Sequence, residues 1–264
     1  MKIGIFDSGI GGVSVLNEAF HRLPDQDYIF YADVDHVPYG IKSSEQIIEY
    51  TDSITAFLIE QGVDAILIAC NTATAVAADY LRSKYPVPII GMEPAVKPAV
   101  EEAKEGRVLV MATPVTIREN KLHTLLERVD TQHRVDLLPM PSLVRFAEDE
   151  LFEGEEVDTY IEEQIAVFDK DKYSELVLGC THFNYFKPGL LKAFNNEIQL
   201  IDGNVGTVRH LAEVLGIKEN EAGDIDIEEI NKRTTYLGSG RPADNDQLEK
   251  ILRLHNRLEY VRQL

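Results

Sequence analysis

Short apolar runs along the chain alternate with longer stretches in which apolar residues recur every three or four positions. The short runs predict strands, and several are continuously apolar, which is typical of parallel strands covered on both faces. They fall at Lys2–Phe6, Tyr28–Ala32, Ala65–Ala69, Arg107–Met111, Val135–Leu138 and Leu176–Gly179, with shorter ones near Ile89 and Leu200. The alternation predicts an α/β fold with right-handed crossovers.

Two pairs of polar residues have the spacing of a capping box, which marks the start of a helix. They are Ser43 with Gln46 and Thr116 with Glu119. After the first pair, residues 44–61 carry apolar side chains at helical spacing, so one face of that helix is expected to pack on the sheet. We expect a helix to start at each pair.

The two halves of the chain carry a similar pattern. Each half opens with a strand that ends in a polar turn, at Asp7 and at Thr113. Each later has a strand that ends in a cysteine followed by polar residues, at Cys70 and at Cys180. A proline-rich stretch over residues 85–98 predicts a stiff junction, because proline lacks a backbone donor and disfavours helix before it. We therefore expect two similar α/β units, with a ligand at the carboxyl ends of their strands.

The 264 residues include 26 Lys and Arg against 45 Asp and Glu, a formal net charge of −19. Such a field repels phosphate backbones, which argues against nucleic-acid binding through bulk charge. The longest apolar runs, such as Ala65–Cys70, are far shorter than the ~18 residues of a membrane span, and the N-terminus lacks the layout of a signal peptide. We expect a soluble cytoplasmic protein with neither a nucleic-acid nor a membrane partner.

The chain has two cysteines, Cys70 and Cys180. They lack the paired spacing of a zinc site, and one disulfide would be a poor staple for so large a chain. Cys70 opens a predicted helix, where the helix dipole and free N–H groups stabilise a thiolate. Cys180 precedes Thr181 and His182, and a neighbouring imidazole can exchange a proton with a thiol. A buried structural cysteine and a histidine that caps a strand end are the alternatives, but the repetition of the pattern favours function.

Two matched thiols suit the inversion of a carbon stereocentre. One group removes the proton from one face of the carbon while the other delivers a proton to the opposite face. At any moment one sulfur is thiolate and the other thiol, so the two titrate as a coupled pair. Asp7 and Glu148 are the candidate carboxylates that orient or polarise these groups. The alternative for Asp7 is a turn residue, and for Glu148 an acid on an exposed helix face.

A glycine-rich loop over residues 7–12 follows the first predicted strand and opens a helix. Its spacing matches neither the dinucleotide fingerprint nor a phosphate loop with lysine, so it favours a carboxylate over a nucleotide. The turn at Tyr39 and Gly40 can present backbone donors or be a plain β-turn. Thr113 and Thr116 can bind a ligand or cap the helix that begins there.

Together, four segments resemble the signature segments of bacterial glutamate racemases. They are Asp7-Ser8-Gly9, Pro38-Tyr39-Gly40, Cys70-Asn71-Thr72-Ala73 and Gly179-Cys180-Thr181-His182-Phe183. The segments occur in the order and at the spacing of that family, and the similarity spans nearly the whole chain. The resemblance implies a cofactor-independent amino-acid racemase that supplies D-glutamate for peptidoglycan, commonly as a homodimer.

The resemblance also implies two pseudo-symmetric domains, each a mainly parallel sheet flanked by helices, with the active site in the cleft between them. The C-terminal segment returns to the first domain, which places the domains at 1–95 with 207–264 and at 96–206. Cys70 takes the proton from D-glutamate with help from Asp7, and Cys180 takes it from L-glutamate with help from Glu148 and His182. Substrate contacts are implied at Asp7, Ser8, Tyr39, Gly40, Asn71, Thr72, Thr181 and His182, with Thr113 and Thr116 nearby.

The chain departs from the family pattern at two positions. Asn184 stands where proline is usual, and Gly203 follows Asp202 where serine is usual. Neither residue belongs to the set assigned to proton transfer, so the departures concern loop geometry around Cys180 rather than the class of reaction.

Three other functions remain open. An aspartate racemase of the same superfamily would use the same paired thiols, but His182 argues against it. A non-catalytic binding protein for acidic amino acids would need the cleft but not the two cysteines. A cysteine hydrolase would leave one of the cysteines idle.

Overall fold

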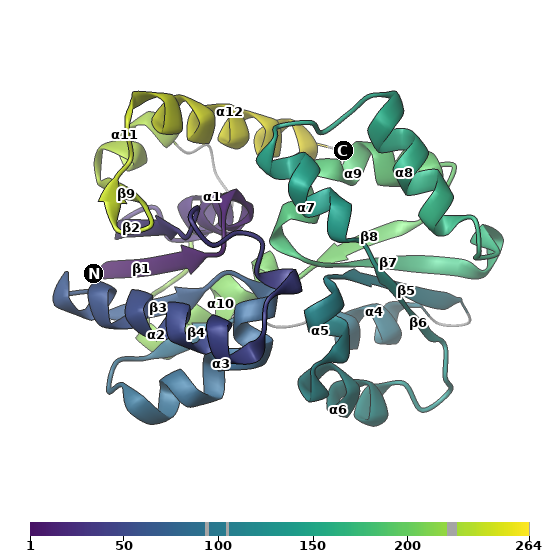
Figure 1. Cartoon of the computed structure of the whole chain (residues 1–264), viewed down its shortest axis with the longest axis horizontal. Coiled ribbons are helices and arrows are strands. Elements are labelled where there is room, and N and C mark those ends of the chain that lie inside the picture. Colours follow the sequence, from purple (N-terminus) through teal and green to yellow (C-terminus); the bar gives the residue numbers. More distant parts are fainter. Residues whose placement is uncertain (93–94, 104–105, 221–225, 264) are drawn as a thin grey trace.

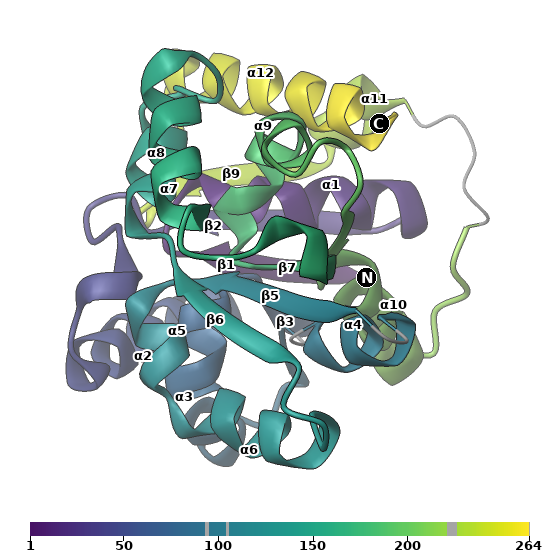
Figure 2. The same cartoon turned by 90° about the vertical axis from the view of Figure 1, so that its right-hand side faces the viewer.

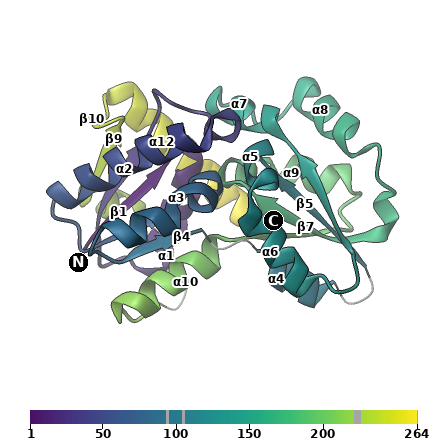
Figure 3. The same cartoon turned by 60° about the horizontal axis from the view of Figure 1, so that its bottom comes forward.

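The structure, a computed structural model, describes residues 1–92, 95–103, 106–220 and 226–263 (Figure 1). Its strands form a six-stranded sheet and a four-stranded sheet. The two sheets lie in separate lobes side by side, each with helices on both faces (Figures 1 and 3). This is the α/β architecture with two mainly parallel sheets that the sequence predicts.

The strands lie close to the positions expected from the apolar runs. They are β1 (Lys2–Asp7), β2 (Asp27–Ala32), β3 (Ala65–Ile68), β4 (Ile89–Gly91), β5 (Arg107–Ala112), β6 (Val135–Pro139), β7 (Tyr173–Gly179), β8 (Gln199–Asp202), β9 (Thr234–Gly238) and β10 (Arg241–Pro242). The sequence did not predict β9 and β10, which form one edge of the six-stranded sheet.

The helices fill most of the connections between strands. They are α1 (Val13–Arg22), α2 (Ser44–Glu60), α3 (Asn71–Lys84), α4 (Val96–Glu102), α5 (Pro114–Arg118), α6 (Asn120–Val129), α7 (Pro141–Glu148), α8 (Glu155–Ile165), α9 (Lys187–Ala193), α10 (Asn204–Leu215), α11 (Ile227–Lys232) and α12 (Asn245–Arg262). Within the described ranges, none of these helices has both the length and the apolar character needed to cross a bilayer.

The two sheets repeat one strand order. The first contains the order β2-β1-β3-β4, and the second is β6-β5-β7-β8. All neighbours in these two series are parallel. The repeat detected in the sequence is therefore a repeat of topology, with β1 equivalent to β5 and β3 to β7.

Each sheet has an apolar layer on both faces because successive side chains of a strand point in opposite directions. In β1, Ile3 and Ile5 pack on the face covered by α1 and α12, and Phe6 packs on the face covered by α2 and α3. In β5, Leu109 and Met111 face α7 to α9, while Val108 faces α4 and α6. Burial on both faces explains the continuously apolar runs.

The C-terminal helix α12 packs on α1 and also reaches the second lobe (Figures 1 and 2). Lys250 donates to the backbone carbonyl of Glu148, and Arg253 pairs with Glu150. The predicted domain limit after residue 95 falls directly before α4, whereas the limit after residue 206 falls inside α10. Within the proline-rich junction, Glu93 and Pro94 lie outside the described residues.

The two predicted capping boxes had different outcomes. At Ser43 and Gln46 both reciprocal hydrogen bonds are present, and α2 starts there as predicted. The prediction of a helix start at Thr116 and Glu119 was wrong. Thr113 is the N-cap of α5 and its hydroxyl accepts from the N–H of Thr116, because Pro114 already supplies the first helical residue.

Candidate active site

Four strands of the two sheets end where the lobes meet. Asp7 is the last residue of β1, and Thr113 directly follows β5. Cys70 is the N-cap of α3, shortly after β3. Cys180 follows β7 and precedes a 3₁₀ helix at Thr181–Phe186. The parallel strands thus deliver both thiols to the carboxyl edges of their sheets, where α/β proteins bind ligands.

The Cys70 sulfur lies in a buried polar setting with only 6% of the residue exposed. Its Sγ accepts from the N–H of Ala73 at 3.4 Å and lies 3.8 Å from Ser8 Oγ, to which the thiol donates. Burial raises the pKa of the Cys70 thiol, and the negative charge of Asp7 raises it further, against the opposing effect of the Ala73 N–H. These surroundings favour the neutral thiol.

The Cys180 sulfur, with 7% of the residue exposed, lies beside an imidazole instead. Its Sγ is 3.7 Å from His182 Nδ1, and His182 Nε2 is 2.8 Å from Glu148 Oε1. Burial acts to lower the pKa of His182, but its hydrogen bonds to Cys180 and Glu148 outweigh burial and raise that pKa well above its ordinary value. A cationic His182 donates from both nitrogens, from Nδ1 toward the Cys180 sulfur and from Nε2 to Glu148.

Glu148 also joins the lobes. Its Oε1 accepts from the N–H of Ile10 at 2.9 Å. Burial acts to raise the pKa of Glu148, but the hydrogen bond and charge of His182, together with the Ile10 N–H, hold that pKa below its ordinary value. Glu148 is therefore an ionised, partly buried carboxylate and not the exposed helix acid of the alternative interpretation.

Asp7 is fully buried between the two halves. Its Oδ1 accepts from Ser8 Oγ at 3.2 Å and from the N–H of Gly9 at 3.0 Å. Its Oδ2 accepts from Thr181 Oγ1 of the other half at 3.0 Å. Burial raises the pKa of Asp7, and the charge of His182 and the hydrogen bonds from Gly9 and Thr181 oppose that rise. Asp7 thus reaches Cys70 through the Ser8 hydroxyl and reaches the Cys180 loop directly.

The glycine-rich loop allows this close packing. A Cβ at Gly9 would collide with the carboxylate of Glu148, and a Cβ at Gly11 would collide with the ring of His182. The glycines therefore let the backbone of the first half approach the acid and imidazole of the second.

Three threonine hydroxyls form a second contact between the halves. Thr72 Oγ1 lies 2.9 Å from Thr113 Oγ1 and 3.1 Å from Thr116 Oγ1, and the latter two are 3.0 Å apart. Gly40 packs against this cluster, since a Cβ there would lie 2.6 Å from Thr113 Cβ. The predicted substrate contacts Gly40, Thr72, Thr113 and Thr116 therefore meet at one place.

Tyr39 is held by a carboxylate that the sequence analysis missed. Its hydroxyl donates to Asp33 Oδ2 at 2.6 Å, and Ser239 Oγ donates to Asp33 Oδ1 at 2.9 Å. His36 Nδ1 lies 2.9 Å from the same carboxylate. Asp33 directly follows β2, so its position at a strand end was a signal available in the sequence.

The remaining predicted contact, Asn71, faces a different place. Its Nδ2 is buried, and in the described part of the chain it has no hydrogen-bond partner. With Thr74, Met92 and Thr116 it lines a small hollow of about 30 Å³. Thr116 links this hollow to the threonine cluster.

Two free thiols with unlike partners can act as one acid and one base. The charge of Cys180 raises the pKa of Cys70, so the two sulfurs lie close enough to interact electrostatically. In the first half, the surroundings of Cys70 favour the neutral thiol. In the second half, Cys180 lies next to the cationic His182.

The chain is similar to known racemases over its whole length. Residues 7–211 match the Asp/Glu/hydantoin racemase family. A glutamate racemase of Lachnospira eligens is 46% identical over 266 residues, with 100% of both chains covered.

Two solved structures are similar in fold. The glutamate racemase of Escherichia coli, solved with L-glutamate, has a TM-score of 0.81 at 29% identity, covering 97% of this chain and 94% of that one. That of Francisella tularensis, solved with D-glutamate, has a TM-score of 0.77 at 26% identity, covering 98% and 93%. The matched sequence, the repeated sheets and the two thiols agree: this chain belongs to the Asp/Glu/hydantoin racemase family.

Proposed function

We propose that the protein interconverts L- and D-glutamate by transferring the α-proton between two thiols. The observation that carries the proposal is the pair of buried sulfurs at equivalent strand ends of the two lobes, each with its own proton partner. Glutamate is the proposed substrate because relatives across the whole chain are glutamate racemases, and because similar structures hold L-glutamate in one case and D-glutamate in another.

In the direction from L to D, the Cys180 thiolate removes the α-proton and becomes a thiol. The carbanion accepts a proton on its opposite face from the Cys70 thiol, which becomes a thiolate. In the reverse direction the roles exchange, so Cys70 removes the proton from D-glutamate. The proton count balances in each direction, and the pair of sulfurs ends each turnover with one proton between them.

The neighbouring groups have separate roles in this proposal. His182, held by Glu148, stabilises negative charge on Cys180 before the L-glutamate proton is removed. The Ser8 hydroxyl links Cys70 to Asp7 and offers the proton of Cys70 a path toward that carboxylate. Substrate is bound by the predicted set: Asp7, Ser8, Tyr39, Gly40, Asn71, Thr72, Thr113, Thr116, Thr181 and His182.

We further propose that no cofactor takes part, since the two thiols supply both proton-transfer groups. We also propose that the protein supplies D-glutamate for peptidoglycan, and that it works in the cytoplasm as a homodimer. Size-exclusion chromatography with light scattering tests the dimer: the mass of one 29.7 kDa chain would contradict it.

The decisive experiment follows the α-hydrogen of L-glutamate by proton NMR in D₂O, with L-aspartate in a parallel sample. We expect the α-hydrogen signal of glutamate to disappear while circular dichroism of the same sample follows the growing D-isomer, and we expect aspartate to stay unchanged. Exchange with aspartate alone would move the substrate to the sister branch of the family, and exchange with neither would favour a binding protein. The Cys180→Ser variant is the control, because it keeps the fold but lacks the base for L-glutamate.

A further inference from the structure

Tyr185 is a buried polar residue next to the site that the proposed mechanism does not use. The residue is fully buried, and its hydroxyl donates to the backbone carbonyl of Ile10 at 3.0 Å. Burial raises the pKa of Tyr185 well above its ordinary value, and the negative charges of Glu148 and Asp7 raise it further. The hydroxyl therefore stays protonated and acts as a donor.

Ile10 joins this tyrosine to the acid of the site. Its carbonyl accepts from Tyr185, and its N–H, on the other side of the same Cα, donates to Glu148 Oε1 at 2.9 Å. The same carboxylate oxygen lies 2.8 Å from Nε2 of His182. Glu148 is therefore held at one oxygen by two donors, one from each half of the molecule.

His182 and Tyr185 share one face of the 3₁₀ helix that follows Cys180, because residues three apart eclipse each other in such a helix. The side chain of His182 contacts Glu148, and that of Tyr185 contacts Ile10. Because Ile10 also donates to Glu148, these contacts close a ring through the helix backbone. A closed ring fixes each member from two sides, so the position of Glu148 depends on Tyr185 as well as on His182.

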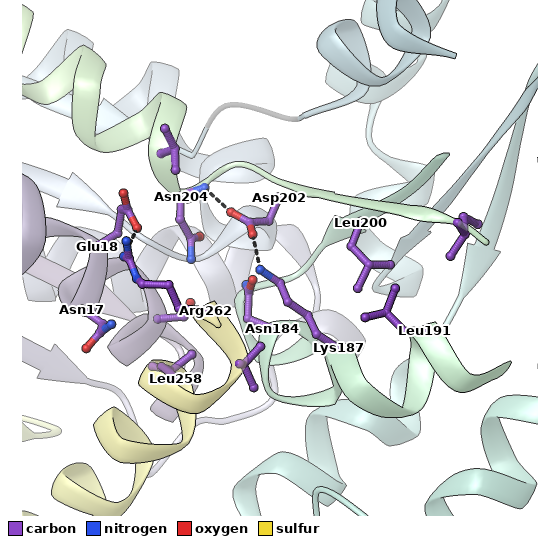
Figure 4. Close-up of a pocket in the computed structure, with 14 residues that line it drawn as sticks. Asn17, Glu18, Asn184, Lys187, Leu191, Leu200, Asp202, Asn204, Leu258 and Arg262 are labelled. Atoms are coloured by element: carbon purple, nitrogen blue, oxygen red, sulfur yellow. Dashed lines mark hydrogen bonds and ion pairs between the residues drawn. The ribbon is translucent and has the colours of Figure 1, made fainter. Parts of the chain in front are cut away.

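Asn184 precedes Tyr185 on the same helix but faces a different place. Its side chain lines a cavity of about 420 Å³, together with Lys187 and Asn204 (Figure 4). The departure from the family pattern at Asn184 therefore concerns the wall of this cavity, while Tyr185 contacts the site.

Tyr185 is itself fixed from two sides. Nε and Nη2 of Arg257, on α12, donate to its backbone carbonyl at 3.3 and 3.1 Å. The ring of Phe152 packs on its ring, with the two centroids 5.1 Å apart. Ile10, by contrast, lies between two glycines, whose backbones can adopt many conformations. The fixed hydroxyl thus restrains a loop that its glycines would otherwise leave free.

We propose that Tyr185 is a positioning residue for proton transfer at Cys180, an inference that rests on the proposed racemase function. Its hydroxyl holds the backbone of Ile10, and the Ile10 N–H holds the carboxylate of Glu148. Glu148 in turn orients His182 against the sulfur. Tyr185 acts through these contacts and not on the substrate.

The test compares Tyr185→Phe with the matched variant Tyr28→Phe. Tyr28 is also buried, and its hydroxyl also donates to backbone carbonyls, at the C-terminal end of α1. The carbonyl of Ile10 keeps a second donor, the N–H of Val13, so Tyr185→Phe is expected to fold. We expect Tyr185→Phe to lower kcat/KM for glutamate about fivefold in both directions, and Tyr28→Phe to change it less than about twofold.

The pH dependence of kcat/KM separates positioning from a general loss of stability. The titratable groups around the imidazole of His182 and its acid are Cys180, Glu148, Asp7 and, from α12, Lys250. Tyr185→Phe removes none of them. Its alkaline limb should nevertheless move to lower pH, because a less firmly held Glu148 stabilises the cationic His182 less. Tyr28→Phe should keep the alkaline limb of the wild type.

Amide hydrogen exchange at Ile10 measures the same contact without turnover. The Ile10 N–H should exchange about tenfold faster in Tyr185→Phe and at the wild-type rate in Tyr28→Phe. Unchanged exchange at Ile10, an unmoved alkaline limb, or the same changes in Tyr28→Phe would overturn the inference while the racemase function stood. A wild-type protein that did not racemise glutamate would overturn the proposed function and this inference together.

Discussion

The two thiol-bearing halves share a topology but not a chemical environment. Cys70 begins a 14-residue helix and interacts with the Ala73 N–H and the Ser8 hydroxyl. Cys180 begins a short 3₁₀ helix and has the His182–Glu148 pair beside it. The repeated fold places the sulfurs at equivalent positions, and the loops that follow give them different hydrogen-bond partners.

This difference is consistent with a reaction that runs equally well in both directions. L- and D-glutamate have the same free energy in water, so kcat/KM must be equal for the two directions whatever the environment of each thiol. The different surroundings of the two thiols can therefore change the protonation of the resting enzyme and the pH dependence of its activity. They cannot change the ratio of kcat/KM between the two directions.

The largest expected effect comes from the thiols themselves. Cys70→Ser and Cys180→Ser should each lower kcat by about 10²–10⁴-fold in both directions, because a hydroxyl is a far weaker acid than a thiol. Circular dichroism of the amino acid follows both reactions. A variant that kept nearly full turnover would show that only one half carries the chemistry.

The next effect separates the halves. His182→Asn should lower kcat/KM about 10- to 100-fold, equally in both directions. In this variant, the alkaline limb of the kcat/KM profile should shift, because the raised pKa of His182 no longer contributes to it. Asp7→Asn is the matched change near Cys70, and it should not produce that shift. Identical pH profiles for the two variants would show that His182 and Asp7 affect the two thiols in the same way.

The third effect is on stability. Glu148→Gln should lower the free energy of unfolding at pH 7 by about 1–3 kcal/mol, because Ile10 and His182 lose a charged acceptor. The folded pKa of Glu148 lies below its ordinary value of 4.5, so its contribution is present above that value and is lost as the pH falls through the folded pKa.

The contribution of His182 has the opposite sign, since its folded pKa is raised. It is present below the ordinary value of 6.5 and is lost as the pH rises through the folded pKa. Urea unfolding at several pH values measures both, and a Glu148→Gln variant with an unchanged acid limb would contradict this account.

The smallest effect tests the corrected helix start. Thr113→Val should cost about 1 kcal/mol of stability because α5 loses its N-cap. Thr116→Val should cost less, because Thr72 keeps its 2.9 Å contact with the Thr113 hydroxyl. The reverse order in thermal unfolding would restore Thr116 as the cap.

The strands at the centres of the sheets could be predicted because both of their faces are apolar. β9 could not, since it lies near the edge and begins with Thr234 and Thr235, leaving Tyr236 and Leu237 as its apolar signal. Its partner β10 contains only two residues, Arg241 and Pro242.

The candidate site divides in the same way. Asp7, Cys70 and Cys180 follow from one rule, because parallel strands bring their carboxyl ends to one edge. The role of Ile10 as a donor to Glu148 comes from packing between lobes, as does the contact between the Thr72 and Thr116 hydroxyls. No local pattern encodes contacts between segments so far apart.

The Asp33 carboxylate gives the end of the chain a part in the rigidity of the site. It fixes the Tyr39 hydroxyl with one oxygen and holds Ser239, 206 positions away, with the other. The turn after β9 therefore stabilises the position of the Tyr39–Gly40 loop through Asp33. A substitution in that turn would first weaken the packing of the Tyr39–Gly40 loop on Thr113, while both sulfurs would stay in place.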